Sequence, residues 1–208
     1  MKIILVLLLL LLPLVFSCKK GTGNFIIKGK ITDETFSTGL DCAIIKLYKV
    51  PVASSSRILV ESFTLQDDGN YSFTFPRERM EKFIVVVEKN LYFKLEKEIF
   101  YASFTVNEPL ICNYGTKAKA WVELRFVNAV VQQSDHFRYI KQDGLVGCED
   151  CCSNTEENIY ANPYFSKICI NNANEIYSIL YWNIGTFQQG YKEALTVPFD
   201  TTLLLINY

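Results

Sequence analysis

Apolar and polar side chains alternate along most of this chain, with the two-residue period of strands that bury one face. From residue 24 to residue 32, apolar residues share one face and lysines fall on the other. The alternation is among the cleanest between residues 120 and 126, where Trp121, Glu123 and Arg125 lie opposite four apolar residues. Tyr and Phe, which favour strands, are abundant. The pattern predicts an all-β chain.

Several further short segments of the first half are predicted strands, and turn-forming or charged residues separate them. They cover residues 43–48, 58–65, 71–75, 83–88 and 91–99. The sequence Asp67-Asp68-Gly69-Asn70 indicates a hairpin, because Gly and Asn tolerate the positive φ that tight hairpin turns require. Residues 76–82 are charged, and we expect them to form a connection with room for one helical turn.

A second block of strands is predicted after residues 109–119, which are rich in Pro, Gly, Asn and Lys and show no periodicity. Its predicted strands cover residues 120–126, 176–184, 191–196 and 201–208. Residues 203–206 are all apolar, which is typical of a central strand buried on both faces. We therefore expect two tandem β-sandwich domains, transthyretin-like or immunoglobulin-like, over residues 24–108 and 118–208.

Most of residues 132–174 lack a strand pattern, with short strand pieces expected only near residues 137–140 and 166–171. This Cys-rich segment is long for a loop in a compact domain, and such loops tend to be functional or cross-linked.

The N-terminus has the pattern of an export signal. Lys2 precedes an unbroken apolar run over residues 3–12. That run is too short for a membrane-spanning helix, which needs about 20 residues. It matches the apolar core of a secretory signal.

Val15-Phe16-Ser17-Cys18 then resembles the bacterial lipoprotein signal, in which a peptidase cuts just before a lipid-modified cysteine. Phe16 departs from the small residue that is usual at its position. The resemblance implies a signal peptide over residues 1–17, lipid attachment at Cys18 and a lipidated tether over residues 18–23. Several acyl chains on one residue anchor a protein stably, since each buried methylene adds about 0.8 kcal/mol.

The resemblance also predicts the location. Lys19 is not the aspartate that enteric bacteria use to retain lipoproteins at the inner membrane, which points to the outer membrane. The body would then be periplasmic or surface-exposed. A plain secretory signal and an uncleaved anchor are the alternatives. Lys19 and Lys20 argue against the uncleaved form, because positive charge resists translocation.

The charge balance excludes one class of partner. The formal net charge is −1, whereas nucleic-acid binding normally shows as a strong basic excess. We therefore expect no nucleic-acid partner. The expected partners are the membrane, through the lipid anchor, and an envelope protein or a glycan.

Four segments of the first block occur in an order known from one module family. They are Gly29-Lys30-Ile31-Thr32-Asp33, residues 43–48, Asp68-Gly69-Asn70-Tyr71-Ser72-Phe73 and residues 83–87. Over roughly residues 24–105 the chain resembles the carboxypeptidase-regulatory-like, transthyretin-like β-sandwich modules of bacterial surface proteins. Cys42 stands where that pattern usually has glycine. The resemblance implies a fold, and no catalytic residue carries over from it.

The whole chain also resembles two-domain lipoproteins of unassigned role found in Bacteroidetes. That resemblance implies a non-catalytic binding or structural role in the cell envelope. An accessory subunit of an envelope complex and a carboxylate-dependent hydrolase are the alternatives.

Six cysteines besides Cys18 suggest disulfides, because the chain is exported. They are Cys42, Cys112, Cys148, Cys151, Cys152 and Cys169. The neighbours Cys151 and Cys152 are not expected to pair with each other, since the peptide between them strains the bridge. Each is expected to bond outward, for instance to Cys148 or Cys169. A metal site on Cys148-x-x-Cys151-Cys152 with Cys169, or reduced thiols, are the alternatives, although structural zinc usually takes two separated pairs.

The remaining polar candidates favour structural interpretations, and we expect no cofactor, metal or catalytic site. His136 is the only histidine, and we expect a surface residue. Asp67, Asp68 and Asn70 could bind calcium but fit a turn better. A set of acidic residues could supply the paired carboxylates of sugar hydrolysis, although a solvated loop is favoured. That set comprises Glu149, Asp150, Glu156 and Glu157.

Aromatic residues of the second block could form a carbohydrate-stacking or partner-binding surface, and some of them must belong to the core. They are Tyr160, Tyr164, Phe165, Tyr177, Tyr181, Trp182, Phe187 and Tyr191. Asp200-Thr201-Thr202 resembles the short O-glycosylation signal of exported Bacteroidetes proteins. A turn entering the last strand is the favoured interpretation of those three residues.

Overall fold

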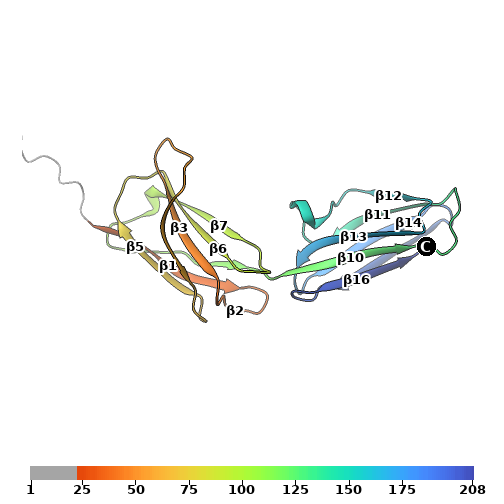
Figure 1. Ribbon diagram of the computed structural model, residues 1–208, viewed down its shortest axis with the longest axis horizontal. Coiled ribbons are helices and arrows are strands. Elements are labelled where there is room, and N and C mark those ends of the chain that lie inside the picture. The colour runs from red at the N-terminus through yellow and green to blue at the C-terminus, as the bar shows by residue number, and fades with distance from the viewer. Residues whose placement is uncertain (1–22) are drawn as a thin grey trace, which may run out of the picture.

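The computed structural model describes residues 23–208, which form an all-β protein as the sequence predicts. The expected signal peptide over residues 1–17, the lipid site Cys18 and most of the tether lie outside the described residues. Four sheets pack in pairs as two sandwiches, and Figure 1 shows the sandwiches end to end along the long axis. No helix among residues 23–208 is long and apolar enough to cross a membrane.

The first sandwich pairs a sheet built around β1 with a four-stranded sheet of order β4-β3-β6-β7. In the first of these sheets β2 and β5 run antiparallel to β1, and β8 and β9 run parallel to it. The strands are β1 (Asn24–Asp33), β2 (Thr38–Gly39), β3 (Ile44–Val50), β4 (Ile58–Thr64), β5 (Asn70–Pro76), β6 (Lys82–Glu88), β7 (Leu95–Phe100), β8 (Pro109–Ile111) and β9 (Tyr114–Thr116).

The second sandwich pairs the sheet β13-β10-β16 with the sheet β12-β11-β14-β15. Alternate residues of β10 enter a core that includes Val122, Leu124, Phe126 and Tyr177, all buried. The strands are β10 (Lys119–Val127), β11 (His136–Asp143), β12 (Glu157–Tyr160), β13 (Tyr164–Asn172), β14 (Ile176–Asn183), β15 (Gln188–Leu195) and β16 (Thr201–Asn207).

Three local expectations are corrected by the structure. Residues 109–116, expected as a connection, supply β8 and β9, which pair with β1 and so belong to the first sandwich. Short strands paired in parallel with β1 have no long alternation that the sequence could display. Residues 132–174, expected to be largely irregular, contain β11, β12 and β13. Residues 76–82 contain no helical turn.

The last strand was also expected to be central, and that expectation is wrong. β16 pairs with β10 along one side only and forms an edge of its sheet. Leu204 and Ile206 point into the core, while Leu203 and Leu205 are 46% and 40% exposed. Residues 203–206 are apolar on both faces of the strand because Leu203 and Leu205 form an apolar surface that faces outward. Burial of both faces is not the reason.

The two sandwiches meet where β10 begins. Ala118 and Ala120 are buried with Ala173 in the core of the first sandwich. The main-chain nitrogen of Ala118 donates to the Oγ1 atom of Thr35 at 2.8 Å. The first core therefore continues into the start of the second sandwich.

A second set of contacts closes the same junction. The ring centroid of Phe199, in the turn before β16, lies 6.1 Å from that of Phe36 and 5.5 Å from that of Tyr92. Beside them, the Lys117 ammonium is 2.5 Å from a carboxylate oxygen of Glu175. These contacts oppose bending between the two bodies.

Candidate functional site

The aromatic residues predicted for the second sandwich divide between its core and its surface. Tyr177 is fully buried, and Phe165 and Tyr181 pack against the core. Tyr160 is 64% exposed and Tyr191 is 49% exposed. Others are also at least partly exposed, and they are Tyr164, Trp182 and Phe187.

Several of the exposed rings gather on the outer face of the sheet β12-β11-β14-β15. Tyr160 lies opposite His136 in the β11–β12 pairing, and their rings stack with centroids 4.5 Å apart. Trp182 lies opposite Arg138, whose guanidinium carbon is 4.8 Å from the centre of the indole. Tyr191 lies opposite Leu180 in the β14–β15 pairing.

Polar side chains lie among these rings. Together with the rings they form one surface, which we call the aromatic face. It comprises Tyr160, His136, Asn158, Arg138, Trp182, Gln189, Tyr191 and Glu193. The Asn158 Oδ1 atom lies 2.7 Å from the His136 Nε2 atom. His136 is partly exposed and stacks on Tyr160, so it is a surface residue, as expected.

The aromatic face continues into a hollow of about 550 Å³ at the end of the sheet nearest the junction. The Tyr191 hydroxyl lies 3.1 Å from a carboxylate oxygen of Glu193 and 3.4 Å from one of Asp143, and either can accept its proton. Asp143 also accepts from the Ser178 hydroxyl at 2.6 Å. Glu175 lines the same hollow, so its wall is acidic.

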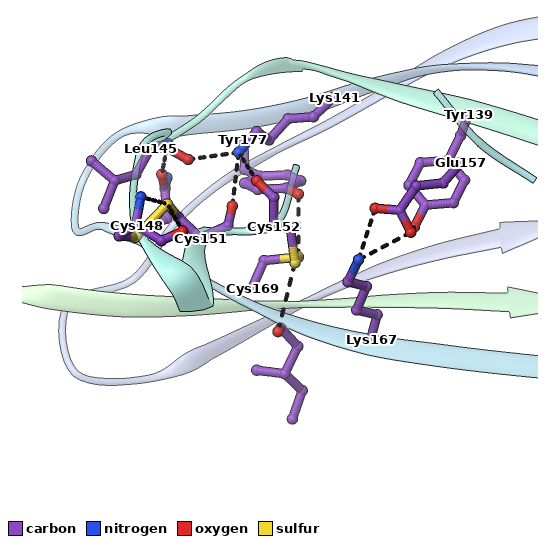
Figure 2. Close-up of a disulfide and its surroundings, with 12 residues drawn as sticks. Tyr139, Lys141, Leu145, Cys148, Cys151, Cys152, Glu157, Lys167, Cys169 and Tyr177 are labelled. Atoms are coloured by element: carbon purple, nitrogen blue, oxygen red, sulfur yellow. Dashed lines mark hydrogen bonds and ion pairs between the residues drawn. A yellow bond between two sulfur atoms is a disulfide. The ribbon is translucent and has the colours of Figure 1, made fainter. Parts of the chain in front are cut away.

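One wall of the hollow is the loop after β11, and a buried lysine holds that loop in place. The Lys141 ammonium donates to the carbonyl oxygens of Leu145, Cys151 and Cys152 at 2.6, 2.7 and 2.6 Å, as Figure 2 shows. Three donors meet three acceptors, so the charge is fully hydrogen-bonded. Burial lowers the pKa of Lys141, and the nearby Lys167 lowers it further.

The same loop carries two disulfides, which join Cys148 to Cys151 and Cys152 to Cys169. Cys151 and Cys152 thus each bond outward. The metal site considered for these cysteines is not formed, and residues 23–208 hold no cluster of three or more His, Cys, Asp or Glu side chains suited to a metal.

Cys42 and Cys112, also candidates for disulfides, are both unpaired thiols. Cys42 lies just before β3 in one sheet of the first sandwich, whereas Cys112 lies between β8 and β9 in the other.

The acidic residues considered for hydrolysis do not form one site. Glu157 points inward, where it accepts from the Tyr139 hydroxyl at 2.9 Å and from Lys167 at 2.7 Å. Glu156 instead lies 3.4 Å from Arg138, on the aromatic face. Glu149 and Asp150 belong to the short 3₁₀ helix η3 (Glu149–Cys151). Neighbouring carboxylates of a strand segment point to opposite faces, so they cannot act on one bond.

The two remaining candidates, the calcium site at Asp68 and the O-glycosylation signal at Asp200, are both turns. The Asp68 carboxylate accepts from the main-chain nitrogen of Asn70 at 2.9 Å and from its side-chain nitrogen at 2.6 Å, and Gly69 has a φ of +70°. The Asp200 carboxylate accepts from the main-chain nitrogen of Thr201 at 2.7 Å, at the start of β16. The aspartates at both positions bind their own backbone.

Sequence reasoning named the aromatic residues and missed Lys141 and Asp143. Both occur in the segment expected to be largely irregular, where strand alternation was not recognised. A lysine on the inward face of a strand is the signal that would have identified the first of them.

No known protein family matches this sequence, and no curated protein does either. Solved structures show a low likeness over most of the chain. The Bacillus anthracis TIE protein matches at a TM-score of 0.40 and 11% identity, over 89% of this chain and 34% of that one. The shaft pilin SpaA from Lactobacillus rhamnosus GG matches at 0.37 and 11%, over 90% and 98% of the two chains. BcpA, the major pilin subunit of Bacillus cereus, matches at 0.35 and 6%, over 88% and 69%. This chain spans about a third of the TIE protein, and likeness at this level assigns no function.

Proposed function

We propose that this chain is a lipoprotein of the cell envelope, anchored by lipid on Cys18 in the outer membrane, with a non-catalytic binding role. The apolar run over residues 3–12 and the sequence ending in Ser17-Cys18 support the anchor. β1 begins at Asn24, so the anchored end of the body is the first sandwich. The second sandwich then carries the binding surface away from the membrane.

The aromatic face is the observation that carries the binding role. Tyr and Trp rings on the water-facing side of a sheet lose the burial that stabilises such residues in a core. Apolar groups gathered on a surface and surrounded by polar residues mark binding sites in soluble domains. The junction contacts of Phe199 and Ala118 support the idea that the second sandwich is presented in a defined direction.

The anchor is tested by metabolic labelling with palmitate. The native chain should incorporate label and partition into detergent, whereas Cys18→Ala should incorporate no label and should keep its uncleaved size. An unlabelled native chain, or a Cys18→Ala variant that is processed and located like the native chain, would overturn the anchor.

The binding role is tested by capture of partners from envelope fractions with the full lipidated protein. The single variants Trp182→Ala and Tyr191→Ala should each capture less partner than the native protein does. Tyr164→Ala is the control matched to Tyr191→Ala, because Tyr164 is about as exposed as Tyr191 but lies on the other sheet of the same sandwich. Equal capture by all the variants would contradict a binding role for the aromatic face.

One observation favours the accessory-subunit alternative. The outer face of β13-β10-β16 places Ile168, Glu123 and Leu203 in one row, with Arg125 and Leu205 in the next. The aliphatic members are exposed, and such a face suits a protein partner. Loss of capture in Ile168→Lys and Tyr164→Ala, with Trp182→Ala unaffected, would support this alternative.

A further inference from the structure

The rings of the aromatic face form a diagonal row across four strands. Tyr160 on β12 stacks on His136 of β11, and Trp182 on β14 stacks with Arg138 two residues farther along β11. Tyr191 on β15 lies on the same face, two residues farther along the strand than Gln189, the partner of Trp182. Neighbouring strands lie about 4.8 Å apart, so the row extends roughly 14 Å across the strands from β12 to β15, and its shift of four residues adds about 13 Å along them. A row of this shape fits an extended ligand that lies across the strands.

The polar groups beside the rings match hydroxyl groups. Asn158 and Gln189 present exposed amides, which both donate and accept hydrogen bonds. Glu193 and Asp143 present carboxylates that accept only. A hydroxyl group can donate to the carboxylates and exchange both kinds of bond with the amides. A sugar ring combines such hydroxyls at its edge with an apolar C–H face that can lie on an aromatic ring.

The charge of the face selects among hydroxyl-rich polymers. Asp143 and Glu193 lie on either side of the Tyr191 hydroxyl. Within the screening length of about 8 Å, these carboxylates repel phosphate or uronate groups. Arg138 is the cation on this face, and it is already stacked on Trp182 and close to Glu156. Neutral sugars therefore fit better than anionic ones.

The composition of the face also argues against a protein partner. Its rings are separated by amide and charged side chains, whereas the exposed aliphatic side chains Ile168, Leu203 and Leu205 lie on the opposite sheet. The cores of protein interfaces are depleted in charged residues. Resting on the binding role proposed above, we propose that the aromatic face binds a neutral polysaccharide chain.

Affinity electrophoresis of the full lipidated protein in non-ionic detergent tests this proposal. The gels contain laminarin, xyloglucan, galactomannan or dextran as neutral polymers, and heparin or polygalacturonate as anionic ones. Trp182→Ala and Tyr191→Ala remove rings, Tyr191→Phe keeps a ring, and Tyr164→Ala is the control on the other sheet. Circular dichroism and the melting temperature of each variant show whether it folds.

At least one neutral polymer should retard the native protein, and neither anionic polymer should. Removing one stacking ring should weaken the interaction about tenfold, which corresponds to about 1.4 kcal/mol. Tyr191→Phe should keep most of the retardation, and Tyr164→Ala all of it. Retardation by the anionic polymers alone, equal retardation of all folded variants, or no retardation by any neutral polymer would overturn the proposal.

The same variants separate this inference from the function on which it rests. If no neutral polymer binds but capture of an envelope protein still requires Trp182 and Tyr191, the binding role stands and the polysaccharide proposal fails. If neither polymer binding nor capture depends on Trp182 and Tyr191, both fail.

Discussion

The side-chain nitrogen of Lys141 lies 2.7 Å from the main-chain carbonyl oxygen of Cys151, so a charged residue on the inward face of β11 holds a disulfide-bonded loop against the second core. Two further carbonyl oxygens of the loop share the same ammonium. A buried charge is tolerated when its hydrogen bonds are complete. The lysine and the disulfides together fix the wall of the acidic hollow.

Lys141→Met should destabilise the protein by about 1–3 kcal/mol, because it leaves buried carbonyl oxygens without a donor. Methionine keeps the aliphatic part of the side chain, so the loss reports mainly on the hydrogen bonds. Urea unfolding near pH 7 with the disulfides intact measures the change. Lys167→Met is the control, since its ion pair with Glu157 is partly exposed and should contribute about 1 kcal/mol or less. Equal losses in the two variants would refute the role assigned to Lys141.

The two disulfides should contribute unequally to stability. Cys152 and Cys169 are 17 residues apart, whereas Cys148 and Cys151 are 3 apart. Loop-closure entropy predicts about 3 kcal/mol for the longer loop and about 2 kcal/mol for the shorter one. This order is tested by the free energies of unfolding of two double variants, Cys152→Ala/Cys169→Ala and Cys148→Ala/Cys151→Ala. A larger loss in the second variant would contradict it.

Alkylation of the native protein should label Cys42 and Cys112 and spare the other four described cysteines. Cys42 is exposed and should react faster than Cys112, which is only partly exposed. Mass spectrometry after proteolysis identifies the labelled residues. Label on Cys148 or Cys169 in the folded, unreduced protein would show that the pairing differs.

The sequence predicts the strands of this protein well where one face is polar. β1, β5 and β10 alternate clearly because one face of each meets a core and the other meets water. The same rule fails for β16, where exposed Leu203 and Leu205 hide the alternation. An apolar residue that faces a partner or an open surface looks the same in a sequence as one that faces a core.

The candidate site could be predicted only in its composition. The aromatic residues were recognisable, but their division depends on register. Tyr181 faces the core and Trp182 faces outward because β14 pairs with β11 in one register, and a shift of one residue would exchange them. Lys141 was not recognised because its three acceptors are main-chain carbonyls, which no side-chain motif reveals.

Phe199→Ala should loosen the connection between the two sandwiches. Its ring contacts Phe36 and Tyr92 of the first sandwich, and the smaller side chain removes both contacts. Small-angle X-ray scattering should show a broader distribution of particle lengths for the variant. Phe187→Ala is the control, because that ring is 93% exposed and lies in the β14–β15 connection. An unchanged scattering profile for Phe199→Ala would show that the main-chain contacts of β10 hold the junction alone.

The stability of this protein should fall as the pH rises above about 10, the pKa of an unperturbed tyrosine. Burial raises the pKa of Tyr71, and burial with the nearby Glu157 raises that of Tyr139. A raised pKa means that the folded state keeps its proton while the unfolded state loses it. The stabilisation is therefore fully present below pH 10 and is lost as the pH climbs toward the folded-state value. The slope is about 1.4 kcal/mol per pH unit for each such tyrosine.

Tyr71→Phe isolates one of these contributions. The Tyr71 hydroxyl donates to the carbonyl oxygen of Cys112 at 2.7 Å, so the variant should be less stable than the native protein at pH 8 by about 1 kcal/mol. Above pH 10 the native protein should lose stability faster than the variant, because phenylalanine has no proton to release on unfolding. The difference between the two should shrink by about 1.4 kcal/mol per pH unit. Urea unfolding at pH 8, 10 and 11 measures it, and a constant difference would mean that the Tyr71 hydroxyl ionises as easily in the folded protein as in the unfolded chain.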